Sequence, residues 1–192
     1  MSELAAAMAA HRSLLEKWRK TMDLVGPGPL EPHFVDAVAC VQGLAAEGRW
    51  ADLGSGAGFP GIALAGNSPL AQIELVESRE KRAAFLQRVV REAGLGSRTT
   101  VRNERSEALP DGAYDGLISR AYKPPLEFLE DAARLLKPGG RVVLLLGDGP
   151  APAWPPGFAE EGRLRYPVVD GHRIRVVLRW MGGLGAPGSG DG

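Results

Sequence analysis

The stretch "ADLGSGAGFPGIAL", residues 51–64, decides the fold of this chain. Four glycines lie between Gly54 and Gly61, with one short apolar run before them and another after them. Glycine permits tight turns and close approach of the backbone to a ligand, and the first turn of a helix offers unpaired N–H groups. The stretch therefore predicts a strand that ends in a ligand-binding loop, followed by a helix.

Strand-like and helix-like segments alternate around and after this loop. The expected strands are residues 49–53, 72–77, 99–104, 114–119 and 141–147, and the expected helices are 78–95 and 125–140. Ser78 is a candidate N-cap of the first of these helices, and Gly94 is its candidate stop. This alternation is typical of βαβ units on a parallel sheet with right-handed connections.

The two ends of the chain differ from this middle part. Apolar residues recur at helical spacing over residues 3–23 and about 33–47, which predicts two helices before the glycine loop. Residues 162–168 and 172–180 are strand-like and adjacent, which predicts a terminal antiparallel pair. The second of these segments alternates apolar residues with arginines, as expected of a strand near a sheet edge with one solvated face.

The composition restricts the classes of function. The chain has 192 residues and a formal net charge of zero, so its overall charge does not indicate binding to nucleic acid. A basic surface on one side of the protein would still be compatible with this net charge. Cys40 is the only cysteine, so no internal disulfide forms, and we expect this residue to be buried. No apolar run reaches the roughly 18 residues of a membrane span, and the N-terminus resembles a helix rather than a signal peptide. We expect a soluble, cytoplasmic protein.

The glycine loop has three interpretations: it binds a dinucleotide, it binds S-adenosylmethionine, or it is a structural turn without a ligand. Gly56, Gly58 and Gly61 match the dinucleotide fingerprint, and Glu77 stands where that fingerprint has its ribose-binding acid. Asp52, directly ahead of the glycines, instead favours a cofactor with a cationic amino-acid end, such as S-adenosylmethionine, because it would repel a diphosphate. The late start of the sheet and the closing antiparallel pair also favour S-adenosylmethionine, and Glu77 would bind ribose hydroxyls in both cases.

The predicted fold is therefore α/β, that of a class I S-adenosylmethionine-dependent methyltransferase. We expect a Rossmann-like, seven-stranded, mostly parallel sheet with a terminal antiparallel strand pair and an N-terminal helical extension. The expected organisation is a helical extension over residues 1–48, a methyltransferase domain over 49–181 and a flexible tail over 182–192.

Three longer strings, in this order, narrow the family: "ADLGSGAGFPGIAL", "LVESREKRAAFLQRVVREAGL" and "YDGLISRAY". Together they resemble the bacterial ribosomal RNA small subunit methyltransferase G family, also called glucose-inhibited division protein B. The resemblance runs from about residue 14 to residue 181 and includes Trp18 in the N-terminal helix. It implies transfer of a methyl group to N7 of a guanosine in 16S ribosomal RNA, with ribosomal RNA or the small ribosomal subunit as partner. We also expect the enzyme to be a monomer.

The resemblance also implies which residues contact the cofactor. Others are expected to do so because they follow the carboxyl ends of strands, where open α/β sheets bind their ligands. The predicted cofactor-binding residues are Gly54, Ser55, Gly56, Phe59, Glu77, Ser106, Glu107 and Arg120. The chain departs from the family where Leu146-Gly147 replaces a usual Lys-Gly and where Arg19 follows Trp18. These departures leave an alternative: a divergent class I methyltransferase that acts on a small molecule or a protein.

The chemistry at guanine N7 requires no proton transfer before attack. N7 carries an in-plane lone pair and no proton, so an enzyme works by holding it about 3–3.5 Å from the sulfonium methyl carbon in an in-line arrangement. Positive charge then develops on the purine, where a nearby acid or carbonyl stabilises it. We therefore predict no catalytic acid or base.

Several polar residues have two interpretations each. Arg120 either contacts the cofactor or an RNA phosphate, or pairs with an acid such as Asp115 or Glu107. Lys81 and Arg82 are candidate RNA contacts or part of a solvated face. His33, three residues before Asp36 on a helix, either lines the substrate site or has a capping or packing role. The three histidines, at positions 11, 33 and 172, are too scattered for a metal site.

Overall fold

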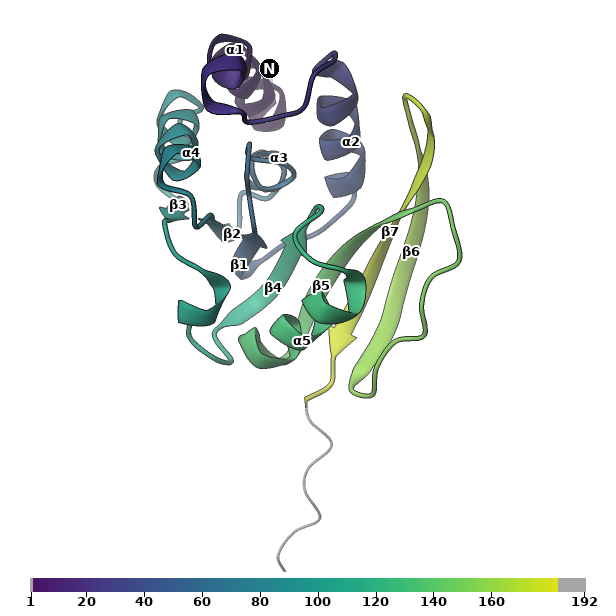
Figure 1. Ribbon diagram of the computed structural model, residues 1–192. Coiled ribbons are helices and arrows are strands. Elements are labelled where there is room, and N and C mark those ends of the chain that lie inside the picture. Colours follow the sequence, from purple (N-terminus) through teal and green to yellow (C-terminus); the bar gives the residue numbers. More distant parts are fainter. Residues whose placement is uncertain (1, 183–192) are drawn as a thin grey trace, which may run out of the picture.

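The glycine loop leaves the carboxyl end of β1 (Gly48–Leu53), near the middle of a seven-stranded sheet (Figure 1). The structure is a computed structural model and describes residues 2–182. The other strands are β2 (Ala71–Val76), β3 (Thr99–Arg102), β4 (Tyr114–Ser119), β5 (Leu136–Gly147), β6 (Phe158–Val168) and β7 (Gly171–Trp180). The sheet order is β3-β2-β1-β4-β5-β7-β6, so the expected seven strands are confirmed.

Strand directions follow the sequence-based prediction. β1 pairs in parallel with both β2 and β4, and β4 pairs in parallel with β5. β7 runs antiparallel between β5 and β6, which leaves β6 as the edge strand. The chain reverses its direction of winding between β1 and β4, and open α/β sheets bind ligands outside the carboxyl ends of the strands at this switch point.

Helices cover the two faces of the sheet unequally. One face carries α1 (Glu3–Met22), α2 (Glu31–Val41), α3 (Gly61–Asn67) and α4 (Glu80–Glu92). The opposite face carries α5 (Pro125–Leu135), together with the short 3₁₀ turn Ser106–Ala108 (Figure 1). Each face of the sheet has its own hydrophobic core, and successive side chains of a strand point into one core and then the other. Trp50 of β1, for example, packs in the first core and Ala51 in the second.

The N-terminal helices belong to the same core as the sheet. α1 lies across α3, so closely that a Cβ on Gly66 would come within 2.9 Å of the Leu4 backbone. Apolar side chains of α1 and α2 share one cluster with β1 and β2. The residues before the predicted boundary at residue 48 therefore pack in the same hydrophobic core as the sheet that follows it. The predicted tail, apart from residue 182, lies outside the described residues.

Several element ends depart from the sequence prediction, among them the start of β6 at Phe158 instead of residue 162. Ser78 does not cap α4, because the N-cap is Arg79 and no side chain bonds to the first turn. α5 ends at Leu135, and β5 begins at Leu136, which pairs with Tyr114 of β4 ahead of a bulge. The second helix begins at Glu31 and ends at Val41, earlier than expected at both ends.

The arginine face of β7 is not fully solvated. Arg175 donates to the carbonyl oxygens of Cys40 and Gln42 at the end of α2, which satisfies carbonyls that a helix C-terminus leaves unpaired. Cys40 is buried, as expected. Across the part of the chain that the structure describes, no helix is long and apolar enough to span a membrane, and no group of residues suits a metal ion.

Candidate cofactor-binding site

The glycine loop is held in a conformation that only glycine adopts freely. Gly54, Gly56 and Gly58 have φ values of +66°, +55° and +98°. Ser55 between them is buried; its N–H donates to the Val76 carbonyl at 3.0 Å, and its hydroxyl donates to the Asp52 carbonyl at 2.8 Å. The loop is therefore fixed to the ends of β1 and β2 by its own backbone.

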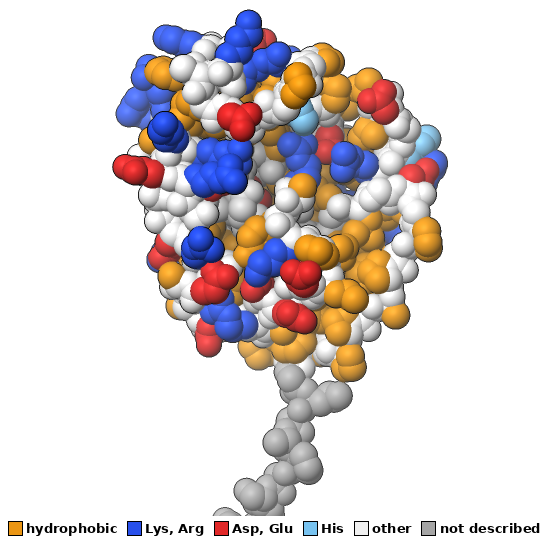
Figure 2. All heavy atoms as spheres, viewed as in Figure 1, with side chains coloured by type: hydrophobic (Ala, Val, Ile, Leu, Met, Phe, Trp, Pro, Cys, Tyr) orange, Lys and Arg blue, Asp and Glu red, His pale blue; other side chains and the backbone are white. Residues whose placement is uncertain are grey.

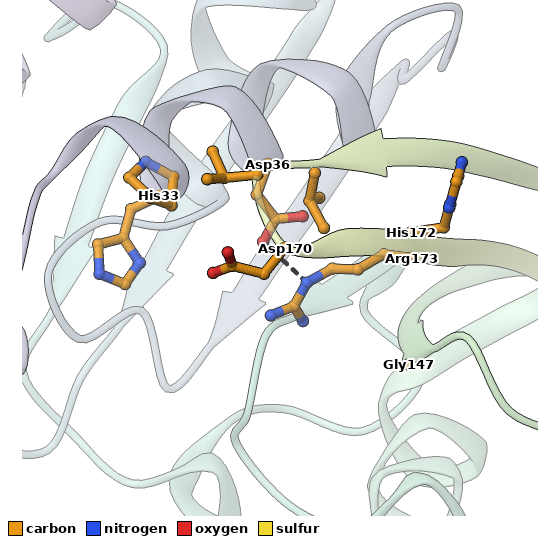
Figure 3. Close-up of a pocket in the computed structure, with 9 residues that line it drawn as sticks. His33, Asp36, Gly147, Asp170, His172 and Arg173 are labelled. Atoms are coloured by element: carbon orange, nitrogen blue, oxygen red, sulfur yellow. Dashed lines mark ion pairs between the residues drawn. The ribbon is translucent and has the colours of Figure 1, made fainter.

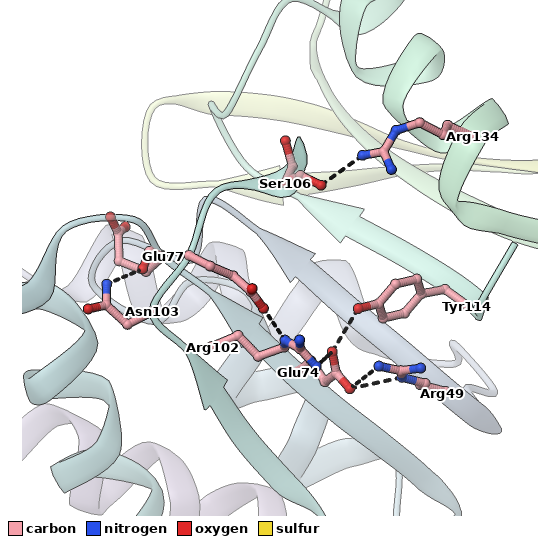
Figure 4. Close-up of polar contacts among 9 residues, drawn as sticks. Arg49, Glu74, Glu77, Arg102, Asn103, Ser106, Tyr114 and Arg134 are labelled. Carbon is pink, nitrogen blue, oxygen red and sulfur yellow. Dashed lines mark hydrogen bonds and ion pairs between the residues drawn. The ribbon is translucent and has the colours of Figure 1, made fainter. Parts of the chain in front are cut away.

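Glu77 ties this loop to the residues after β2. Its Oε2 accepts the Gly56 N–H at 3.0 Å, and its Oε1 accepts the Arg79 N–H at 2.8 Å. The Asn103 amide donates to the Glu77 carbonyl oxygen at 2.9 Å (Figure 4). Each carboxylate oxygen keeps a second lone pair after these bonds, so Glu77 retains acceptor capacity toward a ligand.

A cavity of about 350 Å³ opens beside Gly54 and Glu77. Ser106 and Tyr122 also line it, with their hydroxyl oxygens 2.6 Å apart. Arg134 from α5 donates to the Ser106 carbonyl oxygen at 2.7 Å and fixes the turn that carries it (Figure 4). This volume lies in the range of small-molecule sites, and the cavity lies at the carboxyl ends of β1, β2 and β4.

A partly buried polar network joins the strands that carry the cavity. Glu74 of β2 pairs with Arg49 of β1 at 2.7 Å and accepts the Tyr114 hydroxyl of β4 at 2.7 Å (Figure 4). Burial, followed by the bond to Glu74, raises the pKa of Tyr114. The network joins three adjacent strands and fixes the register from which the ligand-binding loops project.

Four of the predicted cofactor-binding residues line one cavity. They are Gly54, Glu77, Ser106 and Glu107. Ser55 and Gly56 belong to the glycine loop but are not among the residues that line the cavity. Phe59 is buried, and Arg120 points toward Asp36 of α2. Of the predicted substrate contacts, Arg82 lies on the rim of this cavity, Lys81 lies in an adjacent surface hollow, and His33 lines a different cavity.

Several residues that line the cavity were not predicted from the sequence, and Tyr122 is the one with the closest contact to the glycine loop. Tyr122 follows Ala121, which has a φ of +58°, and its ring lies so close to Gly54 that a Cβ there would come within 2.7 Å of it. The rim also carries Arg79, Arg105 and Lys123. The available signal was position, since Tyr122 comes two residues after Arg120 at the end of β4.

Arg120 pairs with Asp36 of α2, at 3.1 Å, and not with Asp115 or Glu107 as one interpretation expected. Its guanidinium also lies over the Phe59 ring, 4.7 Å from the centroid. Asp115 instead pairs with Lys137 at 2.8 Å, at the opposite end of β4. The partner was not predictable because α2 and β4 are far apart in sequence and meet only in the folded chain.

Asp52 does not line the cavity either. Its side chain is buried; Oδ2 accepts the Gly61 N–H at 3.0 Å, and Oδ1 has no partner among the described residues. Burial raises the pKa of this carboxyl to about 7. Asp52 therefore fixes the start of α3, and any attraction it exerts on a cationic ligand group acts through the loop and not by contact.

His11 of α1 holds the same loop from the other side. Its Nε2–H donates to the Ala57 carbonyl oxygen at 2.6 Å, and its ring packs against Phe34 and Phe59. A Cβ on Gly58 would approach the His11 ring within 3.2 Å. Burial lowers the pKa of His11 to about 4, so the ring is neutral at pH 7.

We expect His11 to make stability dependent on pH in the acidic range. The unfolded histidine binds a proton below pH 6.5, whereas the folded one does so only below about pH 4. The contribution of His11 to the free energy of unfolding should therefore fall by about 3 kcal/mol as the pH drops through this window, whereas buried Asp52, with its pKa raised to about 7, contributes a change of the opposite sign. Urea unfolding at a series of pH values would measure this fall.

The matched variants for this test are His11→Gln and His172→Gln. Glutamine at position 11 keeps a donor for Ala57 but does not titrate, so the difference in slope between the wild type and His11→Gln isolates the contribution of His11 from that of Asp52. His172 is exposed, and its replacement should leave the slope unchanged. Equal slopes in the wild type and His11→Gln would contradict the assignment.

Comparisons with known proteins agree with this geometry. The family described as "GidB: rRNA small subunit methyltransferase G" matches residues 5–154. The chain is 37% identical over 185 residues to ribosomal RNA small subunit methyltransferase G of Xanthomonas euvesicatoria, covering 91% of this chain and 86% of that protein. The Xylella fastidiosa protein of the same name is 37% identical over 182 residues, covering 90% and 85%.

Solved structures share the fold at lower identity. TYW2 of P. horikoshii, solved in complex with MeSAdo, is 16% identical with a TM-score of 0.61, covering 82% of this chain and 65% of that one. A SAM-dependent methyltransferase from Aquifex aeolicus is 20% identical with a TM-score of 0.58, covering 86% and 97%.

The sheet order, the glycine loop and the cavity at the switch point define a class I S-adenosylmethionine-dependent methyltransferase. The antiparallel β6–β7 pair completes that architecture. Within this class, the chain belongs to the ribosomal RNA small subunit methyltransferase G family.

Proposed function

We propose that this chain transfers a methyl group to N7 of a guanosine in 16S ribosomal RNA, in the cytoplasm. The observation that carries the proposal is the cavity in which Gly54, Glu77 and Ser106 converge at the switch point, in a chain of this family. S-adenosylmethionine supplies an electrophilic sulfonium methyl group when bound. We also propose that the enzyme acts as a monomer.

The cavity residues fit the cofactor in chemistry as well as in size. Glu77 has acceptor capacity left for ribose hydroxyls, and the loop at Gly54 and Gly56 brings backbone close to the ligand. Ser106 and Glu107, after β3, supply polar groups for the adenine. None of these residues needs to move a proton, since N7 attacks as a free lone pair, so binding and orientation account for the catalysis.

The test is transfer of a labelled methyl group from S-adenosylmethionine to naked 16S RNA and to small ribosomal subunits. The label should appear at a guanine N7, which mass spectrometry of the digested RNA identifies. Labelling of a small metabolite or a protein, with none in RNA, would favour the alternative of a divergent methyltransferase suggested by Leu146 and the neutral net charge.

A local concentration of positive charge supports RNA as the substrate. We call it the basic ridge, and it consists of the exposed side chains Lys17, Lys20, Arg79, Lys81 and Arg105. Figure 2 displays Lys and Arg side chains gathering over α1 and α4. Arg79 and Arg105 also line the cofactor cavity, so an RNA backbone on the ridge would lie beside the reacting methyl.

We expect the double variant Arg79→Gln, Lys81→Gln to bind RNA more weakly, with a shallower dependence on salt. Each lost phosphate contact should reduce the slope of log K against log salt by about 0.7–0.9. Filter binding over a range of salt concentrations would measure the slope. Arg163→Gln on β6, at the opposite edge of the sheet from β3, is the control. An unchanged slope in the double variant would remove the ridge from the RNA interface.

A further inference from the structure

A second cavity, of about 300 Å³, lies outside the cofactor site (Figure 3). It opens between the first turns of α2, the turn that joins β6 to β7, and Gly147 at the carboxyl end of β5. It shares no lining residue with the cavity beside Gly54. Its charged and ring-bearing polar side chains are His33, Asp36, Asp170, His172 and Arg173.

The two cavities are nevertheless connected through one wall. Asp36 of the second cavity pairs with Arg120, whose guanidinium lies on Phe59 of the glycine loop. The His33 ring stacks on the same Phe59, with centroids 5.7 Å apart and planes inclined by 25°. Ala121 and Tyr122, the two residues after Arg120, line the cofactor cavity. The second cavity therefore flanks the cofactor site at the carboxyl ends of β4 and β5.

Arg173 offers the second cavity an anion ligand. Its Nε lies 3.7 Å from Asp36, and its two terminal nitrogens form no hydrogen bond to any residue that the structure describes. Figure 3 shows the guanidinium directed into the cavity, with the Asp170 carboxylate between it and His33 in this view. Asp36 is already occupied, since it accepts the Tyr166 hydroxyl at 2.8 Å and Arg120 at 3.1 Å. An open guanidinium fork of this kind suits a phosphate group.

Asp170 offers the complementary group for a base. Guanine carries donors, N1–H and N2–H₂, on its Watson–Crick edge, and N7 lies on the other edge. An enzyme that modifies N7 must leave that edge free, so it must recognise the base through the donors, for which a carboxylate is the matching acceptor. The Asp170 carboxylate is exposed, faces the interior of the cavity in Figure 3, and is free of ion pairs among the described residues.

We propose that this second cavity receives the target guanosine of the RNA. Arg173 binds its phosphate, Asp170 accepts from N1–H and N2–H₂, and the His33 ring lies beside the base. This assignment rests on the proposed function, because it presumes a guanosine acceptor. It requires the target nucleotide to be unpaired and turned out of any helix.

The first experiment tests binding without turnover. The protein has three histidines, so the ring signals of His11, His33 and His172 can each be followed by NMR as 5′-GMP is added. The signals of His33 and His172 should shift while that of buried His11 stays fixed. 5′-IMP, which lacks the 2-amino group, and 5′-AMP should bind more weakly, and ribose 5-phosphate separates phosphate binding from base recognition.

Two variants assign the roles. Arg173→Gln should weaken 5′-GMP binding roughly ten-fold or more, and Asp170→Asn should remove the preference for 5′-GMP over 5′-IMP. Both should lower kcat/KM for RNA while leaving the affinity for S-adenosylmethionine unchanged in calorimetry. Arg179→Gln is the matched control, because Arg179 lies on the same strand but pairs with Glu161 at its far end.

The outcomes separate this inference from the proposed function. If both variants methylate guanine N7 in RNA as the wild type does, the second cavity is not the acceptor site, although the function stands. If 5′-GMP and 5′-AMP shift the histidine signals equally, base recognition by Asp170 is overturned. If the wild type methylates no guanine N7, the proposed function fails, and the titration still reports whether the cavity binds a guanine nucleotide.

Discussion

Replacement of Gly54 by valine should reduce the affinity for S-adenosylmethionine at least about 100-fold, which corresponds to about 2.7 kcal/mol. Two effects add. Gly54 has a φ of +66°, a conformation that costs an L-residue about 1–2 kcal/mol, and a Cβ there would approach the Tyr122 ring at 2.7 Å. The side chain would therefore displace the Tyr122 ring, which lines the cavity beside Gly54. Isothermal calorimetry with S-adenosylmethionine would measure the loss.

The chain supplies matched controls for this variant. Gly94 has a φ of +70°, but a Cβ there has nothing within 4 Å, so Gly94→Val imposes the same backbone strain without a clash. It should destabilise the fold slightly and leave cofactor affinity intact. The double variant Gly54→Ala, Tyr122→Ala should bind better than Gly54→Ala alone if the clash is with Tyr122. Wild-type affinity in Gly54→Val would mean that the cofactor binds elsewhere.

Replacement of Asp36 by alanine should lower the free energy of unfolding by about 3–5 kcal/mol. Asp36 is only 3% exposed, yet it accepts from both Arg120 and Tyr166, and Arg173 lies close by. Removing the carboxylate leaves a largely buried guanidinium and a buried hydroxyl without their acceptor. Burial raises the pKa of the Tyr166 hydroxyl, so this group cannot relieve the loss by ionising.

Urea unfolding would measure this effect against a surface pair. Asp111 forms an ion pair with Arg134 at 2.5 Å, but its side chain is 74% exposed, so Asp111→Ala should cost at most about 1 kcal/mol. Asp36→Asn keeps an acceptor oxygen and should fall between the two. If Asp36→Ala were as stable as Asp111→Ala, the buried pair would contribute no more than a surface one.

Part of the candidate cofactor cavity could be predicted from the sequence, because those lining residues follow strands in chain order. Gly54 comes after β1, Glu77 after β2 and Ser106 after β3, and parallel strands bring their carboxyl ends to one edge of the sheet. Tyr122 was not found, because its contact with Gly54 depends on the backbone path after β4, where Ala121 has a positive φ.

The surroundings of Arg120 and Asp36 could not be predicted in the same way. Their pairing joins α2 to the end of β4, and Tyr166 reaches Asp36 from β6, 130 positions further along the chain. No local spacing rule connects residues at such separations. The hydrogen bond from His11 of α1 to Ala57 of the glycine loop likewise joins residues that are 46 positions apart in the chain.

The sequence by itself determined the alternation of elements, the parallel sheet with its closing antiparallel pair, and the glycine loop, because hydrophobic periodicity and glycine conformation act over a few neighbouring residues. The tertiary structure alone decided which charged groups meet. It turned Asp52 inward to Gly61, paired Arg120 with Asp36, and left the Arg173 guanidinium facing a second cavity. These choices depend on the packing of α1, α2 and the β6–β7 pair against the sheet, which brings together residues that are distant in the chain.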